Sequence, residues 1–410
     1  MSKINDFIKK LCPNGVEYKS LKDIFELFSG MTGVSNKWAD EGNCRFIDYM
    51  NAYKNNKIDI TKLPYATVKN TKQTTLIQGD LLLTSASEVP DECAIASVIE
   101  DEIQDGIFMD DHLFGLRLKD EYKNIINTTF ISYYLNSKPF RCNLFKAVRG
   151  VTRFYISNKD YMKLNIPIPP LEVQKEIVRI LDKFGELEAE LEAELEARKS
   201  QYEFWRSNVF SSMNNLVKLD DICNITAGGT PAKSHSEYWE NGTIKWLGST
   251  VCENKKGISE VTNYITELGL NKSAAKLLKP GTTLIAMVGA TIGKVAYLDY
   301  EACTNQNVAS LYPKNIDELD TSYLYHACRN LYSIFLDYAN GNFAMASLGY
   351  IKNLEIPLPD INEQRRIAEL LDKFDILVND ISVGLPAEIE LRRQQYEYYR
   401  NKLLSFEEVT

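Results

Sequence analysis

Two segments of this 410-residue chain carry the same pattern, IPIPPLEVQKEIVRILDKF at 166–184 and IPLPDINEQRRIAELLDKF at 356–374. Nine positions are identical at a constant spacing of 190 residues, from the first Ile-Pro to the final Leu-Asp-Lys-Phe. A second match, RKSQYEFWR (198–206) with RRQQYEYYR (392–400), follows at a spacing of 194. The four extra residues are about one helical turn. Self-similarity of this kind indicates an internal duplication, on which the prediction of the fold depends.

Both copies are predicted to be long helices. Apolar residues such as Ile177 and Phe184 recur at steps of three and four, and the second copy repeats this stripe. A Pro-x-Pro pair before each helix keeps the preceding chain extended. The first helix contains LEAELEAE (187–194), a tandem repeat of strong helix formers. In the second helix, Gly384 and Pro386 predict a kink or break.

Each helix of about 40 residues would span on the order of 60 Å, and its apolar stripe needs a partner. The other copy is the obvious candidate. Outside the helices, QGDLLLTS (78–85) and PGTTLIAMVG (280–289) each predict an apolar strand after a glycine turn. The predicted fold is therefore α+β. Two α+β domains alternate with two long helices that pair as an antiparallel coiled coil, with pseudo-two-fold symmetry. The domains are 1–165 and 214–355, and the helical spacers are 166–213 and 356–410.

The composition is that of an ordinary globular protein, with 44% hydrophobic and 25% charged residues. The sequence has no run of about 18 apolar residues and no apolar stretch typical of a secretory signal, so we expect no membrane association. Eight scattered cysteines without a Cys-x-x-Cys pair, beside three histidines, argue against a zinc site. We expect a cytoplasmic protein with reduced cysteines and no bound metal.

The net charge of −9 would by itself argue against a nucleic-acid partner, but the charge is unevenly distributed. Each helical spacer carries −4, and the globular domains are near neutral. Basic side chains also cluster locally. Residues 136–165 contain seven bases and one acid, and residues 270–298 contain four lysines and no acid. Such clusters can hold phosphates, while nearby polar and aromatic groups contact base edges. Solvated surface is the alternative interpretation.

Signals of catalysis are weak. The stretch from Gly289 to Lys294 resembles a phosphate-binding loop, but it has one residue too few between its glycines and Val295 replaces the Ser/Thr. A glycine-rich turn between strands is the favoured interpretation. His112 beside two aspartates is more typical of a surface loop than of a metal site. Neither a nucleophile elbow nor the Asn-Pro-Pro-Tyr motif of adenine methyltransferases occurs. We therefore expect a protein that binds rather than catalyses.

The duplicated Ile-Pro-x-Pro, Gln, Ile and Leu-Asp-Lys-Phe segments resemble the two central helical regions of specificity subunits of type I restriction-modification enzymes. Alternation with two dissimilar globular domains strengthens the resemblance. So do Gly229-Thr-Pro231, Tyr238-Trp239 and Trp246-Leu247, a run common in the target recognition domains of that family. The first domain departs from the pattern, because its Gly30-Met-Thr32 lacks the following proline.

The resemblance implies a non-catalytic subunit that recognises a bipartite double-stranded DNA sequence, with one half-site read by each globular domain. The helices would set the spacing and dock two methylation subunits, and restriction subunits would complete a complex that defends against phage. S-adenosylmethionine, ATP and magnesium would be used on those partner subunits, and no cofactor on this chain. The near-neutral domains suggest weak DNA binding by the chain alone.

On this interpretation, DNA contacts are predicted on loops. In the first domain the candidates are Lys146, Arg149, Thr152, Arg153 and Tyr155, around the glycine turn at Gly150. In the second domain they are Thr230, Lys233, Trp246, Thr291, Lys294, Asn305 and Asn342. Partner docking and coil packing are assigned to Gln174, Phe184, Tyr202, Trp205, Gln364, Phe374, Tyr396 and Tyr399. For the two phenylalanines, packing within the helix pair is the favoured role.

Two other classes of function remain open at the level of sequence. One is a stand-alone nuclease or methyltransferase, which would modify DNA without partners. The other is a scaffold with duplicated modules for binding proteins, which would not be retained on DNA even with methylation subunits present.

Overall fold

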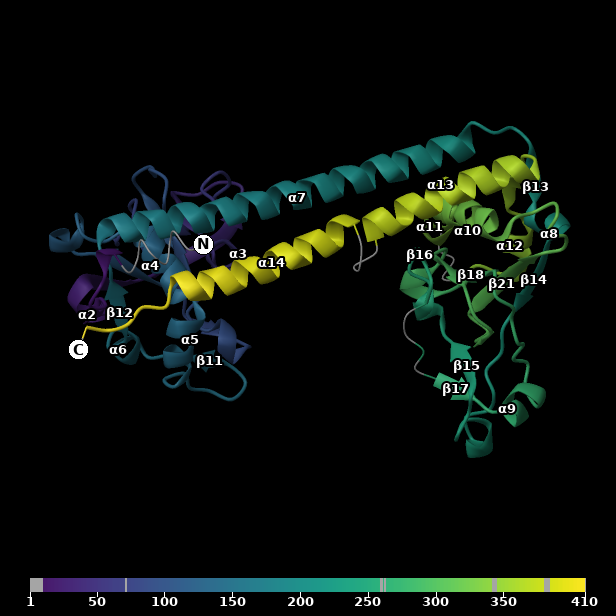
Figure 1. Ribbon diagram of the computed structural model, residues 1–410, viewed down its shortest axis with the longest axis horizontal. Coiled ribbons are helices and arrows are strands. Elements are labelled where there is room, and N and C mark those ends of the chain that lie inside the picture. Colours follow the sequence, from purple (N-terminus) through teal and green to yellow (C-terminus); the bar gives the residue numbers. More distant parts are fainter. Residues whose placement is uncertain are drawn as a thin grey trace. The chain divides into compact units, whose positions relative to one another are not determined.

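The structure is a computed structural model that describes residues 10–70, 72–258, 261, 263–340, 345–379 and 384–409. The chain divides into two compact units that mix helices and strands (Figure 1). Unit 1 is Met1–Ala189 with Leu391–Thr410, and unit 2 is Glu190–Glu390. Each unit thus combines a globular part with portions of the helical segments recognised in the sequence.

Unit 1 is built from short sheets. One has the order β2-β10-β6-β8, formed by β2 (Phe25–Ser29), β10 (Leu113–Leu118), β6 (Leu81–Thr84) and β8 (Ala96–Val98), all antiparallel. A second four-stranded sheet has the order β3-β5-β4-β9, formed by β3 (Val34–Ala39), β5 (Tyr65–Val68), β4 (Cys44–Ile47) and β9 (Ile107–Met109). In this second sheet only the β4–β9 pair is parallel.

Unit 2 repeats this plan. Its larger sheet has the order β14-β21-β18-β19-β16, formed by β14 (Cys223–Ala227), β21 (Val308–Pro313), β18 (Thr282–Ala286), β19 (Val295–Leu298) and β16 (Lys255–Lys256). Its smaller sheet has the order β17-β15-β20, formed by β17 (Asn263–Ile265), β15 (Ile244–Leu247) and β20 (Cys303–Thr304). The β15–β20 pair is parallel, like β4–β9. The two globular domains therefore share a similar topology.

The central strands follow from the apolar runs in the sequence. All residues of β6 and β18 are buried, as expected for strands with covered faces. Each follows a glycine in the left-handed region, Gly79 with φ +90° and Gly281 with φ +87°, where a side chain would be strained. The predicted strands after glycine turns are thus confirmed. In unit 1, Phe130 of α4 (Thr128–Leu135) packs into the same core as Leu81 of β6.

The remaining elements are short. In unit 1 they are α2 (Leu21–Ile24), α3 (Tyr49–Lys54), β7 (Ala86–Ser87), α5 (Lys138–Phe145), β11 (Phe154–Tyr155) and α6 (Asn158–Tyr161). In unit 2 they are α8 (Leu219–Ile222), α9 (Glu267–Asn271), α10 (Thr321–Asn330), α11 (Tyr332–Asn340) and α12 (Leu348–Asn353). Within unit 2, α10 and α11 lie beside α13, and β15, β17 and α9 lie at the end remote from it (Figure 1).

The duplicated segments are helical as predicted. The first forms one uninterrupted helix of 41 residues, α7 (Leu171–Ser211). The second forms α13 (Ile361–Asn379) and α14 (Gly384–Leu403). Gly384 has φ +74°, which no α-helix can accommodate in its interior, so the predicted break is confirmed. Within the ranges that the structure describes, no helix is both long and apolar enough to cross a membrane.

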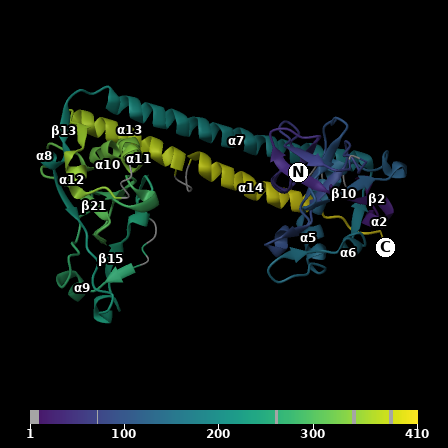
Figure 2. The same ribbon diagram turned by 180° about the vertical axis from the view of Figure 1, so that it is seen from behind.

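Short strand pairs precede the long helices. In unit 1, β1 (Glu17–Ser20) pairs with β12 (Asn165–Ile168), and in unit 2, β13 (Leu216–Lys218) pairs with β22 (Glu355–Pro357). Their prolines hold the chain extended until the helix starts, as predicted. The end of the chain also joins unit 1. The Val409 amide donates to the Val16 carbonyl at 3.1 Å, and the C-terminal end lies near α2 in both views (Figure 2).

Candidate nucleic-acid interface

A buried glutamine ties α7 to the globular part of unit 1. Gln174 Nε2 donates to the carbonyl oxygens of Ile125 and Pro169 at 2.9 and 2.7 Å. Its Oε1 accepts from the amide of Asn127, the N-cap residue of α4, at 2.8 Å. The side chain is fully buried and its amide is saturated. The structure therefore gives Gln174 a role inside its own domain, which corrects its assignment to a docking or coil surface.

The same correction applies in unit 2. Gln364 Nε2 donates to the carbonyl oxygens of Glu318 and Pro359, both at 2.8 Å. Its Oε1 accepts from the amide of Asp320, the N-cap residue of α10, at 3.0 Å. Gln364 is also fully buried. The identical glutamine in the two repeats is thus explained by one anchor that joins each long helix to the helix of its own domain.

Replacing Gln364 with leucine is expected to lower the free energy of unfolding of unit 2 by about 3 kcal/mol, because a backbone amide and two carbonyls lose their buried partner. Urea unfolding of the full chain measures this loss, with hydrogen exchange of α10 peptides to locate it. The control is Gln201→Leu on an exposed position of α7, which should change the value by less than about 0.5 kcal/mol. Equal stability of the two variants would contradict the anchor.

A second anchor uses the aspartate of the Leu-Asp-Lys-Phe repeat. In unit 1, Tyr133 of α4 donates its hydroxyl to Asp182 Oδ1 at 2.7 Å, and Lys57 Nζ lies 3.0 Å from the same oxygen. Burial and this aspartate raise the pKa of the Tyr133 hydroxyl, so tyrosine remains a neutral donor. Lys57 also reaches Glu100 at 2.6 Å. A cation and a hydroxyl from the domain thus fix one carboxylate of α7.

In unit 2 the equivalent carboxylate belongs to Asp372. It lies 2.8 Å from His326 Nε2 on α10, 2.5 Å from Lys256 Nζ on β16, and 3.0 Å from Ser322 Oγ. Burial alone would raise the pKa of Asp372, but the bonds from His326 and Lys256 lower it to about 2. Burial lowers the pKa of His326. Asp372 therefore stays ionised and holds α13 against its domain.

The two long helical regions also contact each other within unit 1. The ring of Phe184 on α7 lies 6.2 Å from that of Tyr396 and 5.6 Å from that of Tyr399, both on α14. Further along α7, Glu188 accepts from Arg393 Nε at 2.6 Å. From the first contact to the second, the residue number rises on α7 and falls on α14. The two helix portions therefore run antiparallel here.

Unit 2 contains an equivalent aromatic cluster. Here the phenylalanine comes from the second repeat and the aromatic pair from the first. Phe374 on α13 lies 6.1 Å from Tyr202 and 6.0 Å from Trp205 on α7, measured between ring centroids. Tyr202 and Trp205 occupy the positions in the first repeat that Tyr396 and Tyr399 occupy in the second. Each phenylalanine of one repeat therefore packs on the aromatic pair of the other repeat.

The predicted DNA contacts of unit 1 gather on one hairpin between α5 and α6. Arg149 and Tyr155 exchange backbone hydrogen bonds, both at 2.9 Å, and close the hairpin. Gly150 has φ +122°, and a side chain there would meet the Arg153 carbonyl. Arg149, Thr152, Arg153 and Tyr155 are all exposed. The structure thus brings four of the five predicted residues together on an exposed, basic turn.

The hairpin borders a groove of about 530 Å³. Thr152 and Arg153 line one side, and His112 and Tyr49 also line it. Lys146, the fifth predicted residue, lies outside this groove at the C-cap of α5, where its Nζ is 3.2 Å from Asn143 Oδ1. Lys146 is exposed but is not part of the hairpin.

In unit 2 three of the predicted residues meet at the remote end of the sheets. Thr230 Oγ1 donates to Gln306 Oε1 at 2.5 Å. Trp246 Nε1 donates to the carbonyl of Gly229 at 2.9 Å, which holds the loop that carries Thr230. Asn305 immediately precedes Gln306 in the turn between β20 and β21. Thr230, Trp246 and Asn305 therefore form one cluster, in which Trp246 is partly buried and positions the loop.

The other predicted residues of unit 2 are more scattered. Lys233 is exposed on the loop after Thr230. Thr291 ends a 3-10 turn, η5 (Gly289–Thr291), which joins the antiparallel strands β18 and β19 and leads into Lys294. The glycine-rich stretch is thus a turn between strands, as favoured, because a phosphate-binding loop would open a helix. Asn342 lies outside the described residues.

Lys37 and Gln306 are two residues of these surfaces that the sequence analysis missed. Lys37 Nζ lies 3.0 Å from Asp110 Oδ2 and 2.5 Å from Asp111 Oδ1, so one ammonium group already pairs with both carboxylates beside His112. Lys37 precedes these aspartates by more than 70 residues, and nothing in the sequence links them. Gln306 follows the predicted Asn305, and its position in the turn was the available signal.

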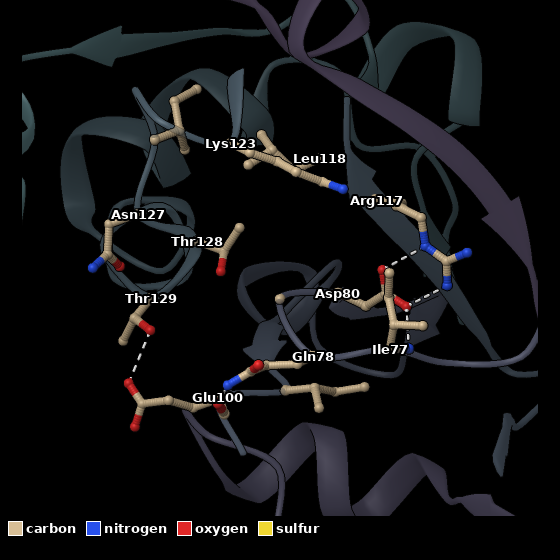
Figure 3. A pocket seen from close by; sticks show the side chains of 13 residues that line it. Ile77, Gln78, Asp80, Glu100, Arg117, Leu118, Lys123, Asn127, Thr128 and Thr129 are labelled. Carbon is tan, nitrogen blue, oxygen red and sulfur yellow. Dashed lines mark hydrogen bonds and ion pairs between the residues drawn. The ribbon is translucent and has the colours of Figure 1, made fainter. Parts of the chain in front are cut away.

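The structure also contains a cavity of about 410 Å³ in unit 1, beside the start of β6 (Figure 3). Figure 3 shows the Arg117 guanidinium facing the Asp80 carboxylate, with hydrogen bonds of 2.9 and 2.7 Å. Arg117 Nη2 also donates to the Thr75 carbonyl at 2.7 Å. Both charged groups already bond to protein atoms. We therefore interpret Arg117 and Asp80 as an ion pair that stabilises the domain at the wall of this cavity.

Comparison with known proteins, by sequence and by structure, gives chains of type I restriction-modification systems. The sequence profile of the type I restriction modification DNA specificity domain matches residues 13–197 and 212–391. A type I restriction enzyme specificity subunit of Escherichia coli is 37% identical over 306 residues, covering 70% of this chain and 72% of that protein. A putative type I restriction enzyme specificity subunit of Haemophilus influenzae is 31% identical over 309 residues, covering 69% and 74%.

Solved structures share the fold at low sequence identity. A chain from a study of assembly of the type I restriction-modification system has a TM-score of 0.70 at 17% identity, covering 96% of this chain and 98% of that one. A specificity subunit from Thermoanaerobacter tengcongensis has a TM-score of 0.53 at 19% identity, covering 96% and 97%. The twofold occurrence of the same plan in units 1 and 2 agrees with the two matched segments.

Proposed function

This chain belongs to the family of type I restriction modification DNA specificity proteins, and on that premise we propose that it reads a bipartite DNA site. Each globular domain, 1–165 and 214–355, contacts one half-site. The helical spacers, 166–213 and 356–410, set the distance between the half-sites. The relatives are named specificity subunits, and such a subunit selects the site without catalysing its modification.

One observation carries this proposal. A corresponding arrangement of sheets occurs in both units, but the exposed side chain on equivalent turns differs, with Asp111 after β9 in unit 1 and Gln306 after β20 in unit 2. A protein that reads two different sequences through one kind of domain needs a shared scaffold with different contact residues. Base contacts specify and phosphate contacts position, so loops of this composition suit both tasks.

The long helices act in this proposal as an antiparallel coiled coil with a pseudo-two-fold axis. Support comes from the exchanged aromatic clusters, in which Phe184 contacts Tyr396 and Phe374 contacts Tyr202, the equivalent residue of the other repeat. A two-fold axis exchanges equivalent residues in this way. The axis would present the two domains to the two DNA strands in inverted orientation, as symmetric dimers do.

We place two methylation subunits on the outer faces of these helices. Phe204 and Tyr398 occupy equivalent positions of the repeat and are 73% and 60% exposed. Large exposed aromatic groups are typical of protein interfaces. Two equivalent sites suit two copies of one partner, and restriction subunits join them. S-adenosylmethionine, ATP and magnesium are used on those partners, and the chain alone binds DNA weakly.

The basic hairpin of unit 1 is expected to contact phosphates. Replacing Arg149 and Arg153 together with alanine should weaken DNA binding of the assembled complex and lower the slope of log K against log salt by about 0.9 for each phosphate that is no longer neutralised. Fluorescence anisotropy with the target duplex at several salt concentrations measures both quantities. Arg179→Ala on α7 is the control, since that arginine is exposed and paired with Glu176. An unchanged slope in the hairpin variant would exclude phosphate contacts there.

The proposed function is tested by co-expressing this chain with the methyltransferase subunit encoded beside it and mapping adenine methylation by single-molecule sequencing. A motif with two specific halves and a fixed gap is the expected result. A short continuous motif would contradict the assignment of one half-site to each domain. If methylation is absent and the purified complex does not retain DNA, the recognition role is wrong.

A further inference from the structure

The turn after β9, the strand of unit 1 that pairs in parallel with β4, is held by three hydrogen bonds from backbone amides. After β9, the Asp110 amide donates to the Ile47 carbonyl at 3.0 Å. The His112 amide donates to Asp110 Oδ1 at 2.8 Å, and the Leu113 amide donates to the Asp110 carbonyl at 3.1 Å. Such a turn, in which a short side chain bonds the backbone two residues on, has a defined shape. It leaves the central residue, Asp111, exposed.

The turn after the parallel strand of unit 2 is held by the same three bonds. The Asn305 amide donates to the Leu247 carbonyl at 2.9 Å. The Asn307 amide donates to Asn305 Oδ1 at 2.9 Å, and the Val308 amide donates to the Asn305 carbonyl at 3.3 Å. The central residue of this turn is Gln306, which is exposed like Asp111. The backbone is thus the same in both units, and the chemistry of the central side chain differs.

Close packing of a glycine fixes each turn further. A side chain at Gly30 would place its Cβ 2.1 Å from the Asp110 carbonyl oxygen, and one at Gly228 would place it 2.0 Å from the Thr304 carbonyl oxygen. Only glycine allows the neighbouring loop to lie this close. This close packing defines where the backbone that carries the central side chain lies.

Each of the two central side chains bonds to a neighbour. That bond determines which hydrogen-bonding group the side chain has left for a ligand. The Gln306 oxygen accepts from Thr230, so the Gln306 amide nitrogen is the group left to donate. Among the described residues, this nitrogen has no hydrogen-bond partner. In unit 1, Lys37 contacts one oxygen of Asp111, and the carboxylate offers acceptors only. One turn therefore presents a donor and the other an acceptor.

We propose that Gln306 and Asp111 are the base-contacting residues at equivalent places in the two domains, a step that rests on the function proposed above. Gln306 would donate to a purine N7 or O6 in the major groove, and Asp111 would accept from the amino group of cytosine or adenine. The Thr230 hydroxyl and the Lys37 ammonium are positioning groups, because they orient the contacting side chains. The two half-sites then differ at the base read by each turn.

The test uses the full chain co-expressed with its methyltransferase partner, and single-molecule methylation mapping of Gln306→Ala and Gln306→Glu. Both variants are expected to change base preference by about tenfold at one position of the second half-site and to leave the first half-site unchanged. Asp111→Asn should change one position of the first half-site only. The control is Glu301→Gln, an exposed residue before β20, which should leave the motif unaltered.

Several results separate this inference from the function on which it rests. If the wild-type chain gives no bipartite motif, the proposed function itself fails. If the wild-type motif is bipartite but both Gln306 variants keep every base preference, the inference is wrong. A uniform fall in methylation without altered preference would also overturn it, because a structural or phosphate-contacting residue behaves in that way. Thermal melting of each variant verifies that the chain remains folded.

Discussion

Replacing Arg329 with methionine is expected to lower the free energy of unfolding of unit 2 by about 3–5 kcal/mol. The guanidinium lies on α10, with 8% of the side chain exposed, and Nη1 donates to Asp375 Oδ1 at 2.7 Å and to the Tyr202 hydroxyl at 3.2 Å. Nη2 donates to Glu203 at 3.2 Å. Methionine fills much of the same volume, so the loss arises from the charges that remain.

The reason for the large effect is the buried carboxylate of Asp375, which is 7% exposed. Removing one member of a buried pair takes a compensating charge away from the other member, and that penalty exceeds what the intact pair contributes. Burial alone lowers the pKa of Arg329, but Tyr202, Tyr325 and Asp375 raise it, so the group stays charged. Arg329 connects a helix of the domain with α7 and α13, so its loss should loosen all three.

Urea unfolding of the full chain, with hydrogen exchange of α10 and α13 peptides, measures the effect. Arg366→Met is a matched control in the same unit, because its pair with Glu363 is 66% exposed on the arginine side and is screened by solvent, so this variant should unfold at nearly the wild-type urea concentration. The double variant Arg329→Met with Asp375→Asn should be less destabilised than the sum of the single variants. A loss below about 1 kcal/mol for Arg329→Met would contradict the argument.

The duplication was predictable because both copies carry the same local sequence patterns. Helical periodicity marks α7, and Gly384 marks the break before α14, since a positive φ cannot occur inside a helix. The strands β6 and β18 follow from an apolar run after a glycine. These features depend only on neighbours within one or two turns of chain. The fold class was accessible for the same reason.

The contacts that join helix to domain were not predictable in the same way. Gln174 was assigned to docking or coil packing because it recurs in the repeat, but its partner Asn127 lies 47 residues away and becomes a neighbour only after folding. The recurrence of a residue in both repeats indicates that it has the same structural or functional role in each. It does not identify that role. The basic hairpin was partly predictable, because Arg149 and Arg153 flank a glycine. Gln306 was not, since its importance comes from a turn shared with unit 1 in three dimensions.

Inserting one more Leu-Glu-Ala-Glu unit after Glu194 is expected to move all methylation to a site whose gap is one to two base pairs longer. Four residues lengthen α7 by about 6 Å and rotate the remainder of the helix by about 40°. Successive base pairs are about 3.4 Å apart, and a full turn takes about 10 base pairs. The added length thus matches about two base pairs, and the added rotation about one. Sites with the original gap should lose methylation almost completely.

Methylation mapping of the co-expressed variant reports gap and half-sites in one experiment. Both half-site sequences should stay unchanged, because the insertion lies far from the loops that carry Arg149 and Gln306. A single alanine inserted at the same place is the control. It lengthens α7 by only about 1.5 Å but rotates its apolar stripe by about 100°, so methylation at every gap should fall. An unchanged gap after the four-residue insertion, or altered half-sites, would show that α7 does not set the spacing.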